Sequence, residues 1–306
     1  MRSISAVIPV YNSEASLEEL YARLTAALRG AARDFEIILV DDGSSDCSWD
    51  AIAGLALKDK RVRGFRLYRN FGQHNAILCG IRAAAKEAVV TLDDDLQNPP
   101  EEIPELVRKL EEGFDVVYGS PASRHHGAMR NASQWIAKVI LQRTLGAEIA
   151  GSVSPFRAFD AELAKAFAGY GGAFVSVDVL LSWCASRYAV VSVRHDPRKK
   201  GASNYTVKKL FNHMFNMMTG FSILPLQLAS MVGFIFTLFG MFVLGYVLVR
   251  YMINGVVVPG FAFLASIIAI FSGAQMFALG IIGEYLARMY FRSMGRPPFM
   301  VREKTS

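Results

Sequence analysis

Three consecutive carboxylates, Asp93, Asp94 and Asp95, follow an apolar segment that is typical of a buried strand. Adjacent carboxylates repel one another unless a cation offsets their charge. Residues two apart in an extended or turning segment face the same way, so Asp93 and Asp95 can grip one ion while Asp94 points elsewhere. Carboxylate oxygens suit Mg²⁺ or Mn²⁺. A solvated acidic turn that caps the helix after Pro99 and Pro100 is the alternative interpretation.

A second acidic pair, Asp41 and Asp42, ends another apolar segment and leads into the polar run from Gly43 to Asp46. Carboxylates at the end of a strand can accept hydrogen bonds from the N–H of a base or from ribose hydroxyls. The serines of the same run can equally serve as ordinary helix caps. The pair by itself leaves a nucleotide site and a helix cap both open.

Both acidic clusters lie in a first half where short β-branched segments alternate with helical patterns. The expected strands cover residues 4–10, 35–41, 62–67, 88–92, 115–118 and 189–193. The expected helices cover residues 14–28, 48–57, 75–85, 101–112 and 135–145. Such alternation is typical of an α/β fold with a doubly wound, mostly parallel sheet covered on both faces. Ligands of these sheets bind beyond the carboxyl ends of the strands, which is where both acidic clusters lie.

The second half of the chain is apolar. Residues 226–249 and 256–283 contain no charged residue. Each stretch is long enough to cross a hydrocarbon core of about 30 Å, which takes about 20 helical residues. A buried helical hairpin in a soluble protein is the alternative, but soluble helices seldom run so far without a charge. We therefore predict two transmembrane helices joined by a short turn at 250–255.

The basic residues gather in this apolar half. Residues 198–306 carry eleven Lys or Arg against two Asp or Glu, whereas the whole chain has a net charge of +6. Residues 1–197 are therefore net negative, and we expect the basic half to meet anionic lipid or phosphate rather than nucleic acid. Lys and Arg flank both outer ends of the helix pair, so the positive-inside rule places those ends and the first half in the cytoplasm.

Two further segments, 207–218 and 284–294, mix Lys or Arg with large apolar side chains. Helices of this kind can lie in the headgroup layer of a membrane. Simple continuation of the membrane helices is the alternative for both.

Four motifs of the first half occur in a fixed order, at 7–14 (VIPVYNSE), 40–46 (VDDGSSD), 69–76 (RNFGQHNA) and 92–100 (LDDDLQNPP). Together they resemble the family 2 glycosyltransferases of the GT-A fold. The likeness is strongest to the polyprenyl-phosphate branch, which includes dolichol-phosphate mannose synthase, bactoprenol glucosyltransferases and the undecaprenyl-phosphate aminoarabinose transferase. It continues through 195–205 (HDPRKKGASNY) into the two apolar helices, and so spans nearly the whole chain.

The resemblance implies roles for individual residues. The implied nucleotide-binding residues are Pro9, Tyr11, Asn12, Glu14, Asp41, Asp42 and Asp94. The implied metal ligands, for Mg²⁺ or Mn²⁺, are Asp93, Asp95 and Gln97. The implied catalytic residues are Asp93, Asp95 and Arg157, of which the arginine is expected to face the phosphates.

The resemblance also implies a site for the lipid phosphate, made by Arg198, Lys199, Ser203 and Tyr205. An arginine fork matches phosphate oxygens, hydroxyls add donors, and the intervening Gly201 lets the chain turn closely. A basic juxtamembrane patch that is attracted to anionic headgroups is the alternative, and both can hold together.

The sequence departs from the family in two places. Family members often carry an Asp shortly before the Phe-Arg pair, and some readings make it a catalytic base, but residues 151–156 (GSVSPF) hold no carboxylate. Many members also show Gly-Ser-Arg after the strand that ends near Tyr118, whereas here three other residues separate Ser120 from Arg124. A phosphate monoester is already anionic near neutral pH, with a second pKa of about 6. Such an acceptor needs orientation more than removal of a proton.

We therefore predict inverting transfer of a sugar from a nucleotide sugar, expected to be a UDP-sugar, to polyprenyl (undecaprenyl) phosphate. The product would be a lipid-linked monosaccharide for cell-envelope glycan or lipopolysaccharide modification. The alternatives are a processive membrane polysaccharide synthase and a non-catalytic sugar-nucleotide sensor on the same fold. Processive synthases usually carry a Gln-x-x-Arg-Trp motif, which this sequence lacks.

The predicted organisation has four parts at the inner (plasma) membrane, assembled as a homo-oligomer with a tetramer as one form. They are a cytoplasmic GT-A domain (1–205), a juxtamembrane amphipathic helix (206–222), a two-helix transmembrane hairpin (223–283), and a C-terminal juxtamembrane helix with a cytoplasmic tail (284–306). The identity of the sugar and the choice between Mg²⁺ and Mn²⁺ stay open at this point.

Overall fold

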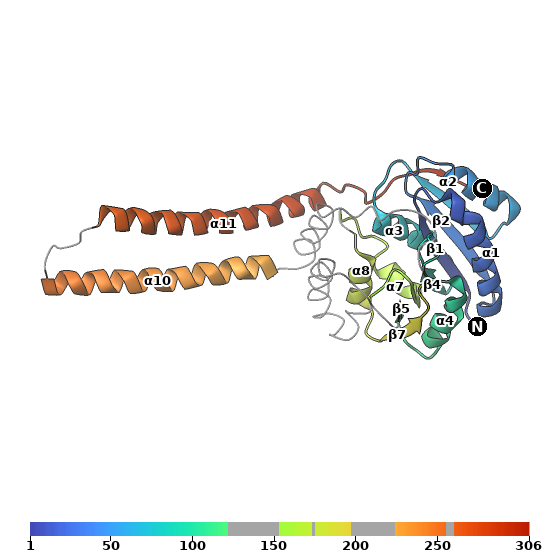
Figure 1. Ribbon diagram of the computed structural model, residues 1–306, viewed down its shortest axis with the longest axis horizontal. Coiled ribbons are helices and arrows are strands. Elements are labelled where there is room, and N and C mark those ends of the chain that lie inside the picture. Colours follow the sequence, from blue (N-terminus) through green and yellow to red (C-terminus); the bar gives the residue numbers. More distant parts are fainter. Residues whose placement is uncertain (122–152, 173–174, 197–223, 255–259, 306) are drawn as a thin grey trace. The chain divides into compact units, whose positions relative to one another are not determined.

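The computed structural model describes residues 1–121, 153–172, 175–196, 224–254 and 260–305 (Figure 1). The chain divides into two units. The first comprises Met1–Phe211 together with Gly295–Ser306, and the second comprises Asn212–Met294. The first unit carries the sheet, and the second carries two long helices.

The first unit is built on one sheet, which has eight strands among the described residues in the order β7-β5-β6-β4-β1-β2-β3-β8. The strands are β1 (Ile4–Val10), β2 (Phe35–Asp41), β3 (Val62–Leu67), β4 (Ala88–Thr91), β5 (Val116–Pro121), β6 (Arg157–Asp160), β7 (Tyr188–Val193) and β8 (Val301–Lys304). Parallel pairs join β1 to β2 and β4, β2 to β3, and β5 to β7, whereas β6 and β8 run antiparallel to their neighbours. The sheet is therefore mostly parallel, as predicted.

Helices cover both faces of the sheet (Figure 1). One face carries α1 (Glu14–Ala31), α2 (Ser48–Lys58) and α4 (Ile103–Glu111), which follows the short 3₁₀ turn Pro100–Glu102. The other face carries α3 (Gln73–Ala83), α7 (Ala161–Ala166) and α8 (Val177–Cys184).

The central strand β1 shows why two helical layers are needed. All seven of its residues are buried. Ile8 packs in the core under α1, whereas its neighbour Val7 packs in the core under α3, because successive side chains of a strand point to opposite faces. Helix α1 packs against Ile8 and the rest of that core with leucines three or four residues apart, among them Leu17 and Leu20.

The predicted elements agree with the structure where their patterns are long. The predicted strands 4–10, 35–41 and 62–67 match β1, β2 and β3. The predicted helix 135–145 lies outside the described residues. The sequence analysis missed β6, β8, α7 and α8, because segments of four to eight residues are too short to show a clear period.

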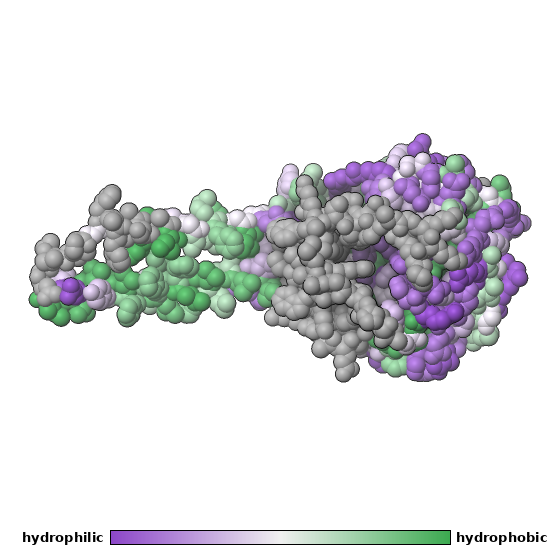
Figure 2. Space-filling model, viewed as in Figure 1, coloured by the Kyte–Doolittle hydropathy of each residue, from purple (hydrophilic) through white to green (hydrophobic). Residues whose placement is uncertain are grey.

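The second unit contains α10 (Leu224–Asn254) and α11 (Phe261–Ser293). Both are long and apolar enough to cross a membrane, with mean hydropathies of 2.4 and 1.3 over their candidate spans, and the most apolar window of each span is 0% buried inside the protein. Figure 2 shows hydrophobic side chains along both helices. Within this unit the rings of Phe236 and Phe271 meet edge to face at 5.5 Å. A bilayer is the solvent that suits this exposed apolar surface, so the chain is a membrane protein.

The C-terminal boundaries differ from the predicted ones. Residues 284–293 continue α11 rather than forming a separate helix, because no Gly or Pro interrupts them. The helix ends just before Gly295, whose φ is +62°. The predicted tail is part of the first unit, where β8 joins the edge of the sheet beside β3. The predicted juxtamembrane helix at 206–222 lies outside the described residues.

Candidate active site

Three loops meet at the carboxyl edge of the parallel strands. They follow β1, β2 and β4, which are neighbours in the sheet. The amide of Tyr11 donates to Asp94 Oδ2 over 3.1 Å, and Ser16 Oγ donates to the carbonyl of Asp94 over 2.9 Å. The amide of Asn12 donates to Ser44 Oγ over 3.0 Å. The loop after β1 therefore links the two acidic loops on either side of it.

Four of the predicted nucleotide-binding residues lie in or beside the loop after β1. Pro9 is buried within the strand, whereas Tyr11, Asn12 and Glu14 are exposed. Asn12 has a φ of +53°, a left-handed conformation that Asn tolerates, and its Oδ1 accepts from the amide of Ser45 over 2.8 Å. The exposed residues can therefore meet a ligand at this edge, while Pro9 shapes the strand beneath them.

Asp41 is fully buried at the end of β2. Its Oδ1 accepts from the amide of Ser44 over 2.9 Å, and its Oδ2 lies 3.5 Å from Nε of Arg66, close enough for an ion pair but not for a hydrogen bond. The carboxylate faces the protein interior. Asp41 therefore helps to shape the loop, and its contact with a nucleotide stays a prediction.

Asp42 ties the loop after β2 to the start of α3. Its two oxygens accept from the amides of Phe71 and Gly72 over 2.7 and 2.9 Å. Burial raises the pKa of Asp42 to about 6, the charge of Asp41 adds to the rise, and the two amides oppose it. A carboxylate of this kind holds the backbone in place and is close to titrating at neutral pH.

Gly43 allows the loops after β2 and β3 to touch. Its φ is +72°, and a Cβ there would lie 2.6 Å from the carbonyl carbon of Arg69 and 2.7 Å from the nitrogen of Asn70. No side chain fits against backbone at that distance, so this position requires glycine. The RNFG motif at 69–72 and the VDDG motif at 40–43 therefore pack against each other.

The acidic triplet lies in the turn after β4, and its three carboxylates are all partly exposed. Asp93 Oδ1 accepts from Gln73 Nε2 over 2.6 Å, and Asp95 Oδ1 accepts from the amide of Gln97 over 3.1 Å. Asp94 faces the loop after β1, and burial raises its pKa. Asp94 thus has a different neighbour from Asp93, and the division of roles within the triplet stays a prediction.

The donor set of this turn fits a metal that is shared with a ligand. Across the described residues, no three or more His, Cys, Asp or Glu side chains converge on one point. Asp93, Asp95 and Gln97 offer hard oxygen atoms from two carboxylates and one amide. Mg²⁺ is commonly held by one or two carboxylates together with water and substrate phosphates rather than by a closed protein cage. The turn suits that kind of site.

Arg157 lies inside the protein, on β6, with 1% of its surface exposed. Its Nη1 is ion-paired with Asp178 Oδ1, and its Nε donates to Thr91 Oγ1 over 3.0 Å. The hydroxyl of Tyr118 also donates to Asp178, over 3.3 Å, and burial raises the pKa of Tyr118 well above its ordinary value. Two nitrogens of the guanidinium therefore have protein partners, and the catalytic role of Arg157 stays a prediction.

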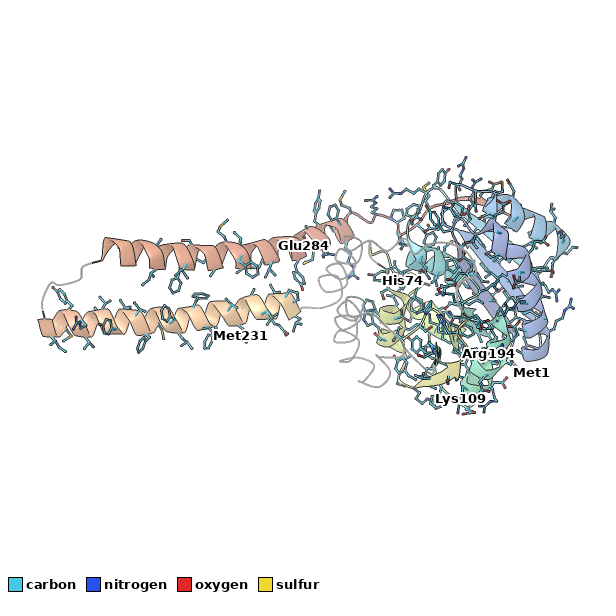
Figure 3. The ribbon with its side chains drawn as sticks, in the orientation of Figure 1. Met1, His74, Lys109, Arg194, Met231 and Glu284 are labelled. Atoms are coloured by element: carbon cyan, nitrogen blue, oxygen red, sulfur yellow. The ribbon has the colours of Figure 1, made fainter. Side chains whose placement is uncertain are left out.

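Asp178, the ion-pair partner of Arg157, is a buried carboxylate that the sequence analysis missed. It lies in the first turn of α8, 21 residues beyond Arg157, in an otherwise apolar helix. A carboxylate in such a helix needs a cationic partner when it is buried, and that was the available signal. Nδ1 of His74, on α3, lies 3.5 Å from the nitrogen of Val177, so α3 also approaches the start of α8 (Figure 3).

The segment after β7 leads toward the predicted lipid-phosphate residues. Arg194, labelled in Figure 3, pairs with Glu102 at 2.9 Å, and the amide of Asp196 donates to the carbonyl of Gln97 over 2.9 Å. The chain is therefore attached to the acidic turn two residues before Arg198. The predicted residues Arg198, Lys199, Ser203 and Tyr205 lie outside the described residues.

A cavity of about 810 Å³ opens elsewhere, at the amino ends of β1 and β4. Its lining includes Arg2, Arg82 and Glu87, and it includes no predicted site residue. Arg2 is paired with Asp160, and Arg82 donates to the carbonyl of Tyr170. The cations of this cavity already have partners, so the carboxyl edge remains the better candidate for chemistry.

The mostly parallel sheet with helices on both faces agrees with the GT-A fold that the sequence predicts. The chain belongs to glycosyl transferase family 2, whose sequence profile matches residues 5–167. It is therefore a glycosyltransferase, as predicted.

Curated relatives match nearly the whole chain. The undecaprenyl-phosphate 4-deoxy-4-formamido-L-arabinose transferase of Shewanella sediminis is 39% identical over 304 residues, which cover 98% of this chain and 92% of the relative. The transferase of the same name from Serratia proteamaculans is 36% identical over 307 residues, with 99% and 94% covered. Glucosyl-3-phosphoglycerate synthase from Mycobacterium tuberculosis, solved with Mn²⁺, uridine diphosphate and phosphoglyceric acid, matches at a TM-score of 0.51 and 22% identity, over 71% of this chain and 76% of that one. This last likeness shows the shared fold.

Proposed function

We propose that this glycosyltransferase moves a sugar from a nucleoside-diphosphate sugar, expected to be a UDP-sugar, to undecaprenyl phosphate. The names of the curated relatives support this acceptor and favour 4-deoxy-4-formamido-L-arabinose as the sugar. The lipid-linked product would serve modification of lipopolysaccharide or of another envelope glycan. The observation that carries the proposal is the hydrogen bond from Asp196 to Gln97, which attaches the start of the basic segment to the acidic turn.

The donor is proposed to bind across the three loops of the carboxyl edge. Tyr11, Asn12 and Glu14 present their side chains there, while Asp41 and Asp42 hold the adjacent backbone. A divalent cation at Asp93, Asp95 and Gln97 would offset the negative charge that builds up on the departing diphosphate. The contact of Gly43 with the backbone of Arg69 and Asn70 would hold the two neighbouring loops in place around the donor.

The transfer itself is proposed to be a direct displacement with inversion. An oxygen of the lipid phosphate forms a bond to the anomeric carbon as the bond from that carbon to the diphosphate oxygen breaks. The phosphate monoester is already anionic near neutral pH, so the protein has to orient it rather than deprotonate it. Arg198, Lys199, Ser203 and Tyr205 are proposed to do so. Arg157 is proposed to act through Thr91 as a positioning residue beneath the acidic turn.

The membrane part is proposed to keep the acceptor beside the site. We propose a cytoplasmic domain over 1–205, a juxtamembrane helix over 206–222 and a hairpin over 223–283 that spans the inner membrane twice. Confinement of the lipid to the same membrane raises its effective concentration at the enzyme. A homo-oligomer is the proposed assembly.

The test is a transfer assay with the full-length protein in detergent or proteoliposomes. It supplies undecaprenyl phosphate, a panel of nucleotide sugars and either Mg²⁺ or Mn²⁺, and reads the mass of the lipid product. We expect one donor to give a lipid carrying a single sugar, and only with a divalent cation present. Hydrolysis of donors without any glycosylated lipid would refute the proposed acceptor, and polymeric product would favour a processive synthase.

A further inference from the structure

The chain that follows the second apolar helix returns to the sheet and covers the outer edge of β3. The amide of Tyr68 donates to the carbonyl of Met300 over 3.0 Å. The amide of Thr305 donates to the carbonyl of Gly64 over 3.0 Å, and the amide of Gly64 donates to Thr305 Oγ1 over 2.8 Å. We name residues 299–305 the tail strand. Its hydrogen bonds run from Gly64, inside β3, to Tyr68, just after the strand.

The contact between β3 and the tail strand is specific rather than a chance pairing at an exposed edge. A Cβ at Gly64 would lie 2.9 Å from Cγ2 of Thr305 and 2.5 Å from Cγ2 of Ile52, so the edge has room for this residue only as glycine. Phe299 packs against the core on the α3 side, and the guanidinium of Arg82 lies 5.3 Å from its ring. Both ends of the tail strand are therefore fixed by side chains as well as by backbone.

The strand that the tail strand covers leads directly into the candidate donor site. β3 ends at Leu67, and Tyr68 is followed by the loop that packs on Gly43. The next residues, Phe71 and Gly72, donate the two amide hydrogen bonds that hold Asp42. The bond from Tyr68 to the tail strand therefore lies three residues before the backbone on which Asp42 depends.

A second route runs through side chains. Arg66, on β3, lies with Nε 3.5 Å from Oδ2 of buried Asp41 and with Nη1 3.9 Å from Oε2 of Glu303 on β8. Its guanidinium also lies 5.9 Å from the ring of Trp49. Arg66 balances the charge of buried Asp41, at the end of β2. The tail strand places a second carboxylate, that of Glu303, near the same arginine.

We propose that the tail strand is a positioning element for the donor site. It keeps the backbone from Tyr68 to Gly72 in the conformation that Asp42 and Gly43 need, and it helps to set Arg66 against Asp41. Without it β3 would be a bare edge strand, whose hydrogen-bonding groups face water and whose end frays readily. The inference rests on the proposed function only in naming the bound group a nucleotide donor.

The first experiment compares two changes to the full-length protein. One removes residues 300–306, and the other inserts four Gly/Ser residues after Gly295, which leaves the tail strand intact but slackens its link to the second apolar helix. Hydrogen exchange is read on the peptide covering 62–72, together with KM for the nucleotide sugar and for undecaprenyl phosphate. We expect truncation to speed exchange over 68–72 and to raise the donor KM about fivefold to tenfold, the equivalent of about 1 kcal/mol of ordering. The insertion should change neither quantity.

A point variant covers the case in which the truncated chain does not fold. Thr305→Val keeps the shape of the side chain but removes the oxygen that accepts from Gly64, and Arg302→Ala, on the same strand, is its matched control. We expect Thr305→Val to speed exchange over 62–68 and to raise the donor KM about twofold, with the acceptor KM unchanged. An unchanged donor KM in the truncated protein, or a rise in the acceptor KM alone, would overturn the proposal. Exchange is measured without catalysis, so a failure of the proposed acceptor would not be mistaken for a failure of this inference.

Discussion

The carboxylates around the carboxyl edge fall into two groups that the protein uses differently. Asp42 and Asp178 are buried, and their oxygens accept from the protein's own backbone, arginine and tyrosine. Asp93 and Asp95 are partly exposed in the turn after β4. Residues of one chemical type thus serve the scaffold in one group, in the loop after β2 and on α8, and are accessible to a ligand in the other, in the turn after β4.

The difference shows that an acidic motif does not by itself define a ligand site. A buried carboxylate without partners is costly, so burial selects positions where arginine or backbone amides compensate the charge. A partly exposed carboxylate keeps water on some of its lone pairs and can exchange that water for a cation. The comparison therefore predicts losses of stability for one group and losses of activity for the other.

The largest effect is expected from breaking the most deeply buried pair. Asp178→Ala leaves the guanidinium of Arg157 buried without its counter-charge, so the free energy of unfolding should fall by about 3–5 kcal/mol. Unfolding of the full-length protein in detergent, followed by tryptophan fluorescence, measures the loss. The matched double variant Arg157→Met with Asp178→Leu should recover most of the stability. If the single variant is as stable as the wild type, the buried carboxylates do not differ from the partly exposed ones in their effect on stability.

Asp95→Ala should lower activity and leave stability nearly unchanged. We expect turnover to fall by about 10²–10³-fold, the scale of losing one pre-organised group that stabilises transition-state charge. The free energy of unfolding should change by about 1 kcal/mol or less, because the side chain is partly exposed and accepts a hydrogen bond from the amide of Gln97. The transfer assay and the unfolding assay are run together. Glu18→Ala, in an exposed ion pair with Lys58, is the control, and wild-type turnover in Asp95→Ala would contradict the metal assignment.

Asp42 should make stability depend on pH in a defined direction. Its pKa is raised to about 6 in the folded protein, above the ordinary value of about 3.9, so its contribution is fully present below about pH 4 and is lost as the pH rises through about 6. Asp42→Asn removes this titration. The change in unfolding free energy between pH 4 and pH 7 should differ between the wild type and the variant by about 2–3 kcal/mol. Parallel stability profiles for the two proteins would rule out the raised pKa.

The smallest effect is expected at Asp46, the exposed carboxylate at the end of the same loop. Its oxygens accept from the amides of Glu14 and Ser48 over 3.2 and 3.1 Å, and hydrogen bonds of this kind lower its pKa. Asp46→Ala should cost about 1 kcal/mol of stability, as the loss of a helix cap does. Chemical denaturation in detergent measures it, with Asp50→Ala, in the first turn of α2, as the comparison. A loss as large as that of Asp178→Ala would place Asp46 in the buried group.

The parts of the fold that could be predicted from the sequence are those with long, local patterns. Strands β1 to β3 and the two apolar helices have periodic or uninterrupted apolar runs, so their positions follow from the chain alone. Strands β6 and β8 have four residues each, and no local pattern separates them from loops. They form because β4 and β3 offer unpaired edges, which is a property of the assembled sheet.

The candidate site divides in the same way. Both acidic loops could be located from the sequence, because each acidic cluster directly follows an apolar strand segment. Parallel strands bring their carboxyl ends to one edge of the sheet, so the two loops were expected to lie close together. The burial of Asp41, the pairing of Arg157 with Asp178 and the attachment of Asp196 to Gln97 join residues distant in the sequence, and nothing in the local pattern encodes them.

The amino-acid sequence alone determined that this protein is a family 2 glycosyltransferase with an α/β domain and two apolar helices, because these features reside in short-range order along the chain. Only the tertiary structure decided which carboxylates are buried with protein partners and which stay accessible, and that the tail strand covers the outer edge of β3. Burial and partner choice depend on what the rest of the chain packs around each residue, and that is settled only when the sheet and its helices have come together.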